Sequence, residues 1–262
     1  PIRVGVNSGS IIEPIGRNQK PEYREQKTED RKQKTEEGRR TREEGRNGLA
    51  DRLVKSALGY IKILEKIDFC DIVVSLKASD VLTTIEAYRL FSKKSDYPLH
   101  LGVTAAGPLS TGLVKSSIGI GVLLLEGIGD TIRVSLTGNP CEEVIAAKNI
   151  LQALNLRRFG PEIISCPTCG RCQVDLQKIV DELSFTVDRL PFTVTGGTRY
   201  TVNGQRTVFP KIAVMGCEVN GPGEAKESDI GVAFGKGAGV LFKKGKVIKR
   251  VIGTKEEPYC WI

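Results

Sequence analysis

The sequence predicts an α/β fold in which four successive β-α units form a parallel sheet, followed by a smaller α+β domain. Short β-branched runs alternate with amphipathic helical stretches up to about residue 156, and this alternation ends after Gly160-Pro161. Strand–helix alternation implies crossover connections, which place consecutive strands parallel in one sheet. We therefore expect a first domain over residues 1–160 and a second domain over residues 161–262.

The predicted strands of the first domain are short apolar runs, each followed by a helical stretch. The runs are Ile2–Val6, Asp71–Leu76, Leu99–Thr104 and Thr131–Leu136. Between and after them, apolar residues recur at spacings of three and four, which indicates helices with one face on the core. The four stripes are Leu49/Leu53/Val54/Ala57/Leu58/Ile61/Leu64, Ile85/Tyr88/Phe91, Ile118/Val122/Leu123 and Val144/Ala147/Ile150/Leu151.

The second domain has a different pattern of short strands and glycine-rich turns. One helix is expected near Val174–Leu183, and a strand over Lys211–Gly216. Thr193–Arg206 is typical of a hairpin or loop insertion, and Gly239–Val251 of a hairpin that turns at Lys244-Gly245.

Charge and composition restrict the function classes. The chain carries a net charge of +8, and residues 17–47 form a charged insertion that we expect to be a solvated arm or an exposed helix. This segment lacks the interleaved aromatic residues of a nucleic-acid interface, so no nucleic-acid partner is expected. The remaining positive charge suits a phosphorylated ligand.

Compartment and membrane association are also predicted from composition. No apolar run approaches the length of a membrane span, and the first residues lack a signal-peptide pattern. The seven cysteines are odd in number, and four of them lie in Cys166–Cys172 and at Cys217. This clustering favours metal or redox use in a reducing compartment, so a cytoplasmic protein is expected.

Polar residues follow the strands of the first domain at equivalent places. Asn7, Lys77, Thr104 and Ser135 stand at or near the strand ends. Ligands of parallel α/β sheets bind at the carboxyl ends of the strands. The pattern therefore predicts a ligand face at this end of the sheet.

The cysteine motifs carry the most chemistry. Cys166-Pro-Thr-Cys169 and Cys217 supply three thiols, and Glu224 follows Cys217 in a Gly/Pro-rich loop, as in an incomplete thiolate cage around a metal. Cys172 is either a bystander or the fourth ligand. Four thiolates would make an electron carrier. A zinc-stabilised basic nucleic-acid-binding module is a further alternative, disfavoured because His100 is the only histidine.

Several motifs together resemble the 4-hydroxy-3-methylbut-2-en-1-yl diphosphate synthase family. They are the two cysteine motifs, the second within Val214–Ala225 (VMGCEVNGPGEA), together with Val74–Ser79 (VSLKAS), Gly119-Ile-Gly121 and Glu126–Ser135 (EGIGDTIRVS). The resemblance covers nearly the whole chain except about residues 13–48 and 185–208. It implies a TIM-barrel portion followed by an iron–sulfur domain.

The resemblance also implies a reaction and its participants. A [4Fe–4S] cluster would be held by Cys166, Cys169, Cys217 and Glu224, which leaves Cys172 as a bystander. The reaction would be the reductive opening and dehydration of 2-C-methyl-D-erythritol 2,4-cyclodiphosphate to 4-hydroxy-3-methylbut-2-enyl diphosphate. Flavodoxin or ferredoxin would supply electrons to a homodimer.

The diphosphate of such a substrate needs cations and oriented hydrogen-bond partners. The cations expected to bind it are Arg3, Lys77 and Arg133. Neutral partners are expected from Asn7, Ser75, Thr104, Ser135 and Asn220.

Two features depart from the family pattern. The chain contains only what resembles the last four units of an eight-stranded barrel, so we expect it to be part of a longer protein. The loop after the third strand carries Ala105, within Thr104-Ala-Ala-Gly107, where the family has glutamate. That glutamate is expected to bind substrate or donate a proton, so an impaired variant is predicted.

Overall fold

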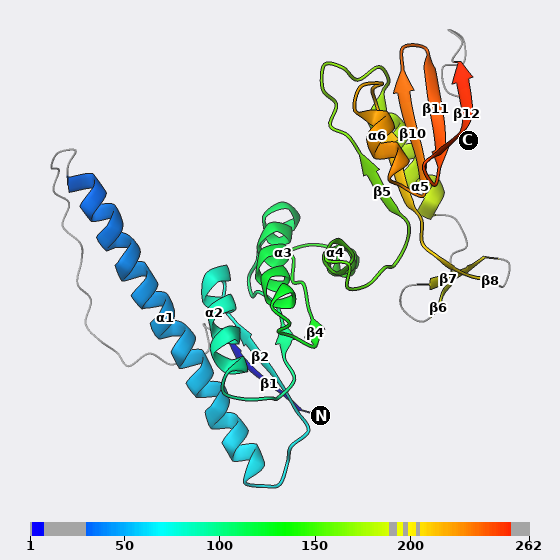
Figure 1. Ribbon diagram of the computed structural model, residues 1–262. Coiled ribbons are helices and arrows are strands. Elements are labelled where there is room, and N and C mark those ends of the chain that lie inside the picture. The colour runs from blue at the N-terminus through cyan, green and yellow to red at the C-terminus, as the bar shows by residue number, and fades with distance from the viewer. Residues whose placement is uncertain (1, 8–29, 189–192, 196–198, 203–204, 253–262) are drawn as a thin grey trace. The chain divides into compact units, whose positions relative to one another are not determined.

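The computed structural model describes residues 2–7, 30–188, 193–195, 199–202 and 205–252; side chains at 30–42, 188, 193–208, 251 and 252 are not described. The chain forms two compact units, Pro1–Leu154 and Asn155–Ile262 (Figure 1). Within the described residues, no helix combines the length and the apolar character needed to cross a membrane.

Strands and helices alternate through the first unit, as predicted. Strands β1 and β2 pair in parallel, β3 and β4 pair in parallel, and a parallel bridge between Val74 and Leu99 joins β2 to β3. The four β-α units are β1 (Ile2–Asn7), α1 (Asp30–Glu65), β2 (Ile72–Lys77), α2 (Val81–Ser92), β3 (His100–Leu101), α3 (Leu109–Leu125), β4 (Thr131–Ile132) and α4 (Pro140–Ala153).

The sheet of the first unit has an apolar face and a polar face. Val4 and Val6 of β1 are buried, whereas Arg3, Gly5 and Asn7, which alternate with them, are exposed, because successive strand residues point to opposite sides. The apolar face packs against helices, and the predicted stripe of α1 is confirmed. Its most buried members are Leu53, Val54, Ala57 and Ile61, each at most 3% exposed.

Helix α1 extends well beyond the packed part of the unit. Residues 30–47, the described part of the predicted charged insertion, form its N-terminal half, while residues 17–29 lie outside the described residues. From Glu43 to Gly48 the side chains are mostly exposed, and full burial begins at Ala50. Residues 43–48 are therefore a largely solvated part of a helix that is fixed by its apolar half.

Helices α3 and α4 pack through only part of the stripes predicted for them. Leu123 of α3 and Ile150 of α4 are buried, whereas Ile118 is 48% exposed and Val144 is 55% exposed. The buried face of α3 consists largely of Gly112, Ser116, Gly119, Ile120 and Leu123. A Cβ at Gly119 would lie 2.7 Å from Cγ2 of Val103, so small residues let the helix approach the sheet closely. Periodicity missed this face because glycine and serine are not counted as apolar.

The hydroxyl of Tyr88 stands between β2 and β3. Val74 N–H donates to Pro98 O at 2.8 Å, and in a regular parallel ladder Leu76 N–H would then donate to His100 O. Instead Leu76 N–H donates to the Tyr88 hydroxyl at 3.1 Å, and that hydroxyl donates to His100 O at 2.6 Å. Ser75 Oγ donates to the same carbonyl at 2.9 Å.

The observed strands are shorter than the predicted ones. Leu99–Thr104 and Thr131–Leu136 were expected to be full strands, but regular strand covers only two residues in each, and Leu99 adds a single bridge to Val74. A second side chain continues the interruption, because Ala78 N–H donates to Thr84 Oγ1 at 3.1 Å. Side-chain hydroxyls thus replace part of the backbone pairing between the carboxyl end of β2 and the segment of β3, while β2 stays paired with β1.

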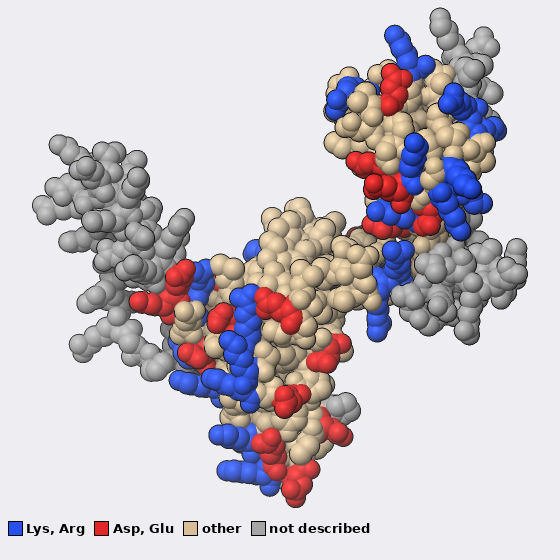
Figure 2. Space-filling view, viewed as in Figure 1, with Lys and Arg blue, Asp and Glu red and all other residues tan. Residues whose placement is uncertain are grey.

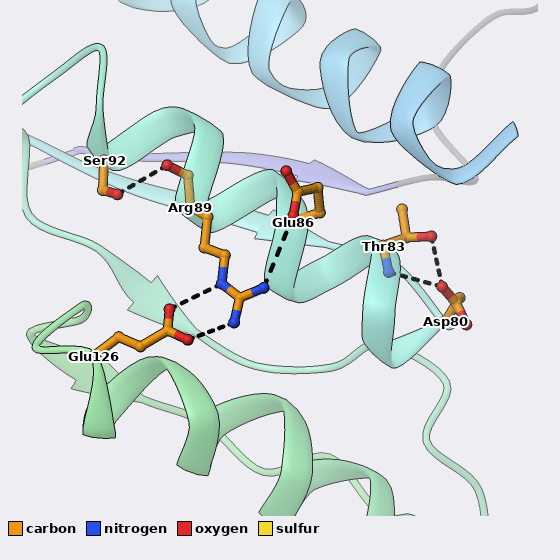
Figure 3. A network of polar contacts seen from close by, with 6 residues as sticks. All are labelled: Asp80, Thr83, Glu86, Arg89, Ser92 and Glu126. Carbon is orange, nitrogen blue, oxygen red and sulfur yellow. Dashed lines mark hydrogen bonds and ion pairs between the residues drawn. The ribbon is translucent and has the colours of Figure 1, made fainter. Parts of the chain in front are cut away.

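A polar network on the surface joins α2 to the end of α3 (Figure 3). Arg89 Nε donates to Glu126 Oε2 at 2.9 Å, its Nη2 pairs with the other carboxylate oxygen, and Glu86 lies one turn before it. The pair raises the pKa of Arg89 and lowers the pKa of Glu126. At the start of α2, Asp80 Oδ2 accepts from Thr83 N–H at 2.7 Å and caps the helix.

The second unit is built on a five-stranded sheet in the order β12-β11-β10-β9-β5. Strands β5, β9 and β10 run parallel, β11 is antiparallel to its neighbours, and β12 is an edge strand. The sheet strands are β5 (Glu162–Ser165), β9 (Lys211–Met215), β10 (Ile230–Gly235), β11 (Ala238–Lys243) and β12 (Lys246–Ile252).

The other elements of the second unit also follow the prediction. The predicted helix and the insertion are confirmed, as is the turn at Lys244-Gly245. The helices are α5 (Leu176–Asp188) and α6 (Gly221–Lys226), and the insertion forms a separate three-stranded sheet of β6 (Thr193–Thr195), β7 (Arg199–Val202) and β8 (Gln205–Val208).

We predict that Tyr88→Phe lowers the free energy of unfolding by about 1–3 kcal/mol. The substitution keeps the buried ring but leaves the Leu76 N–H without an acceptor. Urea unfolding monitored by circular dichroism measures the change. Tyr60→Phe, at a side chain that is 55% exposed, is the matched control. Equal stabilities for the two variants would contradict the role assigned to the Tyr88 hydroxyl.

Candidate functional site

The first candidate site is a basic cluster on the polar face of the first unit. Arg3 of β1, Lys77 at the end of β2 and Arg133 just after β4 are near enough for Arg133 and Arg3 to lower the pKa of Lys77. His100 of β3 completes the group, because all three cations also lower its pKa. The three cations predicted from sequence are therefore brought together.

Lys77 is the central member of this cluster. Its residue is only 4% exposed, and burial, followed by the positive charges of Arg133 and Arg3, lowers its pKa to about 8. Gly102 makes room for it: a Cβ there would lie 2.7 Å from Arg133 O and 3.5 Å from Lys77 Nζ. A buried amine between two guanidinium groups is electrostatically unfavourable without an anion, so the arrangement is suited to binding one.

His100 was missed as a site residue in the sequence, where a lone histidine carries no pattern. Its Nδ1 lies 2.8 Å from Thr131 Oγ1, and its buried Nε2 has no hydrogen-bond partner among the described residues. Burial, and then the charges of Lys77, Arg3 and Arg133, lower its pKa to about 4. His100 is therefore neutral near pH 7, and its unpaired Nε2 is buried close enough to the cations to be influenced by their charge.

The neutral residues predicted for this face occupy the same end of the sheet. Asn7 is in register with Lys77 in the β1–β2 pair. Ser75 is buried and turns its hydroxyl to His100 O, as described above. Thr104 N–H donates to Ala78 O at 3.1 Å, and Ser135 is half-buried beyond β4.

Ala105 has an unusual backbone conformation in the loop after β3. Its φ of 50° lies in the left-handed region, which costs a residue with a Cβ about 1–2 kcal/mol, and its side chain is exposed. Strained residues of this kind cluster at functional sites, where the surrounding structure holds them. Ala105, which stands where the family has glutamate, is therefore held in a loop with a strained backbone.

The second candidate site lies at the carboxyl ends of β5 and β9 in the second unit. Cys166 directly follows β5, and Cys217 comes two residues after β9, which pairs with β5 in parallel. Gly216 N–H donates to Cys166 Sγ at 3.2 Å and ties the two loops together. Two sequence motifs about fifty residues apart are thus brought to one end of one sheet.

The electrostatics of the site favour thiolates. Backbone N–H groups of Asn220 and Val219 lower the pKa of Cys217, and the backbone and side chain of Arg171 lower the pKa of Cys169. The negative charge of Cys217 acts in the opposite direction on Cys169, so the two thiols are close enough to interact. Thiolate is the form that binds iron.

Cys172 has a different environment from the other thiols of its motif. Its S–H donates to Val174 O at 3.3 Å, and its side chain packs beside Leu176, Val214 and Phe234. A Cβ at Gly216 would overlap its sulfur, so the thiol occupies the space that this glycine leaves. Cys172 behaves as a small packed side chain.

Asn220 and Glu224 lie at the start of helix α6, which follows Cys217. Asn220 precedes the helix, Glu224 lies in its first turn, and both are exposed. The donor chemistry of Cys166, Cys169, Cys217 and Glu224 fits an iron–sulfur cluster. Among the side chains that the structure describes, however, no three of His, Cys, Asp and Glu converge closely enough to hold a metal ion.

Comparison with known families identifies two domains in this chain. Residues 1–148 match the family model described as the GcpE TIM-barrel domain, and residues 162–257 match the GcpE protein C-terminal domain. The parallel β-α units thus correspond to the TIM-barrel part, and the unit with the cysteine loops corresponds to the C-terminal domain.

Curated relatives agree with the domain matches. A protein of Thermodesulfovibrio yellowstonii is 54% identical over 205 residues, which are 78% of this chain and 54% of the relative. One from Clostridium perfringens is 48% identical over 258 residues, which are 98% of this chain and 61% of the relative. Both are named 4-hydroxy-3-methylbut-2-en-1-yl diphosphate synthase (flavodoxin). The chain thus spans less than two thirds of either relative.

We predict that Gly216→Ala destabilises the protein by about 1–3 kcal/mol, because the added methyl group overlaps the Cys172 sulfur. Removal of that sulfur by Cys172→Ala should relieve most of the cost in the double variant. Urea unfolding under reducing, anaerobic conditions measures all three variants as a double-mutant cycle.

Gly223→Ala is the control for this cycle, because a Cβ at Gly223 would meet nothing within 4 Å. Additive effects of Gly216→Ala and Cys172→Ala would show that the two residues do not share this space.

Proposed function

The chain belongs to the GcpE family, and from that membership we propose that its protein converts 2-C-methyl-D-erythritol 2,4-cyclodiphosphate to 4-hydroxy-3-methylbut-2-enyl diphosphate. The reaction is a two-electron reductive ring opening with loss of water. The observation that carries the proposal is the combination of domain matches across most of the chain with a basic cluster and a thiol site of the expected chemistry.

The basic cluster is proposed to hold the substrate diphosphate. Arg3 of β1, Lys77 of β2 and Arg133 after β4 supply positive charge, and their mutual repulsion is relieved when an anion binds. The neutral His100 ring and the side chains of Asn7, Ser75, Thr104 and Ser135 offer directional hydrogen bonds around it. Cationic groups in place before binding stabilise negative charge without reorganisation.

The thiol site is proposed to bind a [4Fe–4S] cluster through Cys166, Cys169, Cys217 and Glu224, with Asn220 close to the bound substrate. Such a cluster supplies single electrons and an exchangeable iron position when bound, because carboxylate is a harder and weaker ligand to iron than thiolate. The backbone amides beside Cys217 and the guanidinium of Arg171 favour the thiolates that such a ligand set needs.

The remaining participants are proposed from the family. The first unit is proposed to be the substrate-binding, C-terminal half of an eight-stranded barrel, and the second unit the cluster domain. Flavodoxin, which appears in the names of the relatives, or ferredoxin would supply the electrons. A homodimer is proposed, in which the cluster domain of one subunit meets the barrel of the other.

The two alternatives from sequence gain no support. An electron carrier with four thiolates needs Cys172 as a thiolate, whereas its S–H donates to a backbone carbonyl. A basic nucleic-acid-binding module needs a concentrated positive face. Figure 2 shows acidic side chains interspersed with basic ones on the described surface in view. Neither domain match names nucleic acid or electron carriage.

We predict that anaerobically purified protein contains iron and sulfide in equal amounts, and that the cluster survives Cys172→Ala. Substitution of Cys166, Cys169 or Cys217 by serine should abolish it, and Glu224→Ala should weaken its retention, because these residues are the proposed ligands. Iron, sulfide and zinc analysis, together with visible absorption, measures these outcomes. Zinc in the absence of sulfide would refute the cluster proposal.

We predict that Ala105→Glu, in the complete protein, raises turnover of the cyclodiphosphate by about 10²–10⁴-fold, the range typical of a positioned acid or base. Anaerobic turnover with reduced flavodoxin measures the effect. Ala105→Gln is the matched control, because it adds the same length without an ionisable group. Equal turnover of the protein with Ala105 and of the Glu variant would rule out proton transfer at this position.

A further inference from the structure

Helix α5 covers only part of one sheet face in the second unit. The helix packs on β5 and β9, and its apolar side reaches as far as Val232 and Phe234 of β10. Strands β11 and β12 lie beyond β10, at the edge of the sheet (Figure 1). The outer part of this face therefore extends past the helix that covers its inner part.

The strand register places apolar and basic side chains together on this outer part. Residues directly opposite on neighbouring strands point to the same face, as do residues two apart on one strand. The bulge in the β11–β12 pair brings two lysines that are three residues apart onto one face. The six residues that share the face, called the open face below, are Ile230, Val232, Leu241, Lys243, Lys246 and Lys249.

The open face has an apolar centre and a basic rim. Ile230 is 38% exposed, Val232 and Leu241 are half-buried, and the three lysines are exposed. The opposite side of β11 is closed, because Phe242 is buried there and Lys226 of α6 lies over its ring. The two sides of this hairpin thus differ in accessibility.

The positive charge of the rim is not neutralised within the described residues. None of the three lysines forms an ion pair with a described residue, and β10, β11 and β12 contain no aspartate or glutamate. Asp229 precedes β10, but its carboxylate accepts from Lys211 N–H at 2.8 Å. The rim therefore offers its charge to an anionic partner.

The open face begins beside the strand that leads into the thiol site. Val232 pairs with Val214 of β9, and Cys217 comes three residues after Val214. At roughly 3.3 Å per strand residue, this separation is about 10 Å along β9. A protein that docks on the open face would therefore lie close to the loop that carries Cys217.

We propose that the open face is the docking surface for an acidic electron-donor protein. The proposal rests on the proposed function, in which flavodoxin or ferredoxin supplies electrons to the cluster domain. An apolar centre with a charged rim is the usual anatomy of a non-obligate interface, and electron-transfer encounters need only a small one. Lysines on the rim attract an oppositely charged partner and speed its association.

The docking surface also has to serve the electron count of the proposed reaction. Each encounter oxidises one donor molecule by one electron, so two encounters supply the two electrons of the ring opening. Rapid exchange of donors is therefore required, which a small, charged interface permits. The open face has no aromatic side chain on which nucleic-acid bases could stack, so an acidic protein is the better fit.

The test compares two variants of the whole protein that have the same change in net charge. Lys246→Glu/Lys249→Glu alters the rim, and Lys62→Glu/Lys66→Glu alters exposed lysines of α1. Circular dichroism establishes that both are folded. Calorimetry with purified flavodoxin should show affinity reduced about tenfold at low ionic strength by the first variant only. High salt should shrink the difference, because it screens exposed charges.

Crosslinking locates the contact independently of affinity. A carbodiimide joins carboxylates of flavodoxin to lysine amines that touch them, and peptide mass spectrometry identifies the lysines. We expect crosslinks at Lys243, Lys246 or Lys249. Equal affinity of the two variants for flavodoxin, or crosslinks confined to other lysines, would overturn the docking proposal. It would equally be overturned if the rim variant lost affinity for a DNA duplex and not for flavodoxin.

A small electron donor separates this proposal from the proposed function. Reduced methyl viologen needs no docking surface, so the rim variant should keep the parent rate with it. The assay uses the complete protein carrying Ala105→Glu and the cyclodiphosphate. Absence of turnover with methyl viologen would refute the proposed function, whereas the docking proposal is decided by flavodoxin binding alone.

Discussion

The placement of one phenol hydroxyl determines the geometry of the first unit. Tyr88 reaches from α2 into the sheet and takes the place of a backbone hydrogen bond between β2 and β3. Because a hydroxyl both accepts and donates, it satisfies the amide on one strand and the carbonyl on the other while holding the strands apart. The carboxyl end of β2 stays paired with β1 but is released from regular pairing with β3, and Lys77 extends there over Gly102.

Elements with strong periodicity were predictable from the sequence, and features built from hydroxyls and glycines were not. The apolar stripe of α1 and the order of the four β-α units follow directly from residue patterns. Tyr88 was predicted to lie in the apolar stripe of α2, and its ring is buried as expected. Its hydroxyl, however, bonds to residues 12 positions away in either direction along the chain, which no local pattern reveals. The packed face of α3 was not predictable either, because it includes Gly112 and Gly119, which an apolar pattern does not count.

The candidate sites were predictable to different degrees. Arg3, Lys77 and Arg133 were predicted from their places near strand ends, and they lie near enough for both arginines to lower the pKa of Lys77, although parallel pairing sets Arg3 opposite Val73 rather than Lys77. His100 could not be predicted as a site residue from a single sequence, because it is distinguished only by its burial beside those cations. The cysteine motifs identified the thiol loops, but only the packing of Cys172 against Gly216 distinguishes it from its neighbours. Glu224 was inferred from resemblance, and its exposed position on α6 gives no independent evidence for a ligand.

The edge strand β12 has a consequence for how the protein behaves at high concentration. No aspartate or glutamate occurs from Ile230 to Lys255, whereas β12 carries Lys246, Lys249 and Arg250. An exposed strand edge offers free amides and carbonyls to any other strand, which is a route to aggregation. If two molecules met edge to edge at β12, like charges would be forced together along the new pairing. The basic edge therefore opposes extension of the sheet from one molecule to the next, which disfavours aggregation through β12.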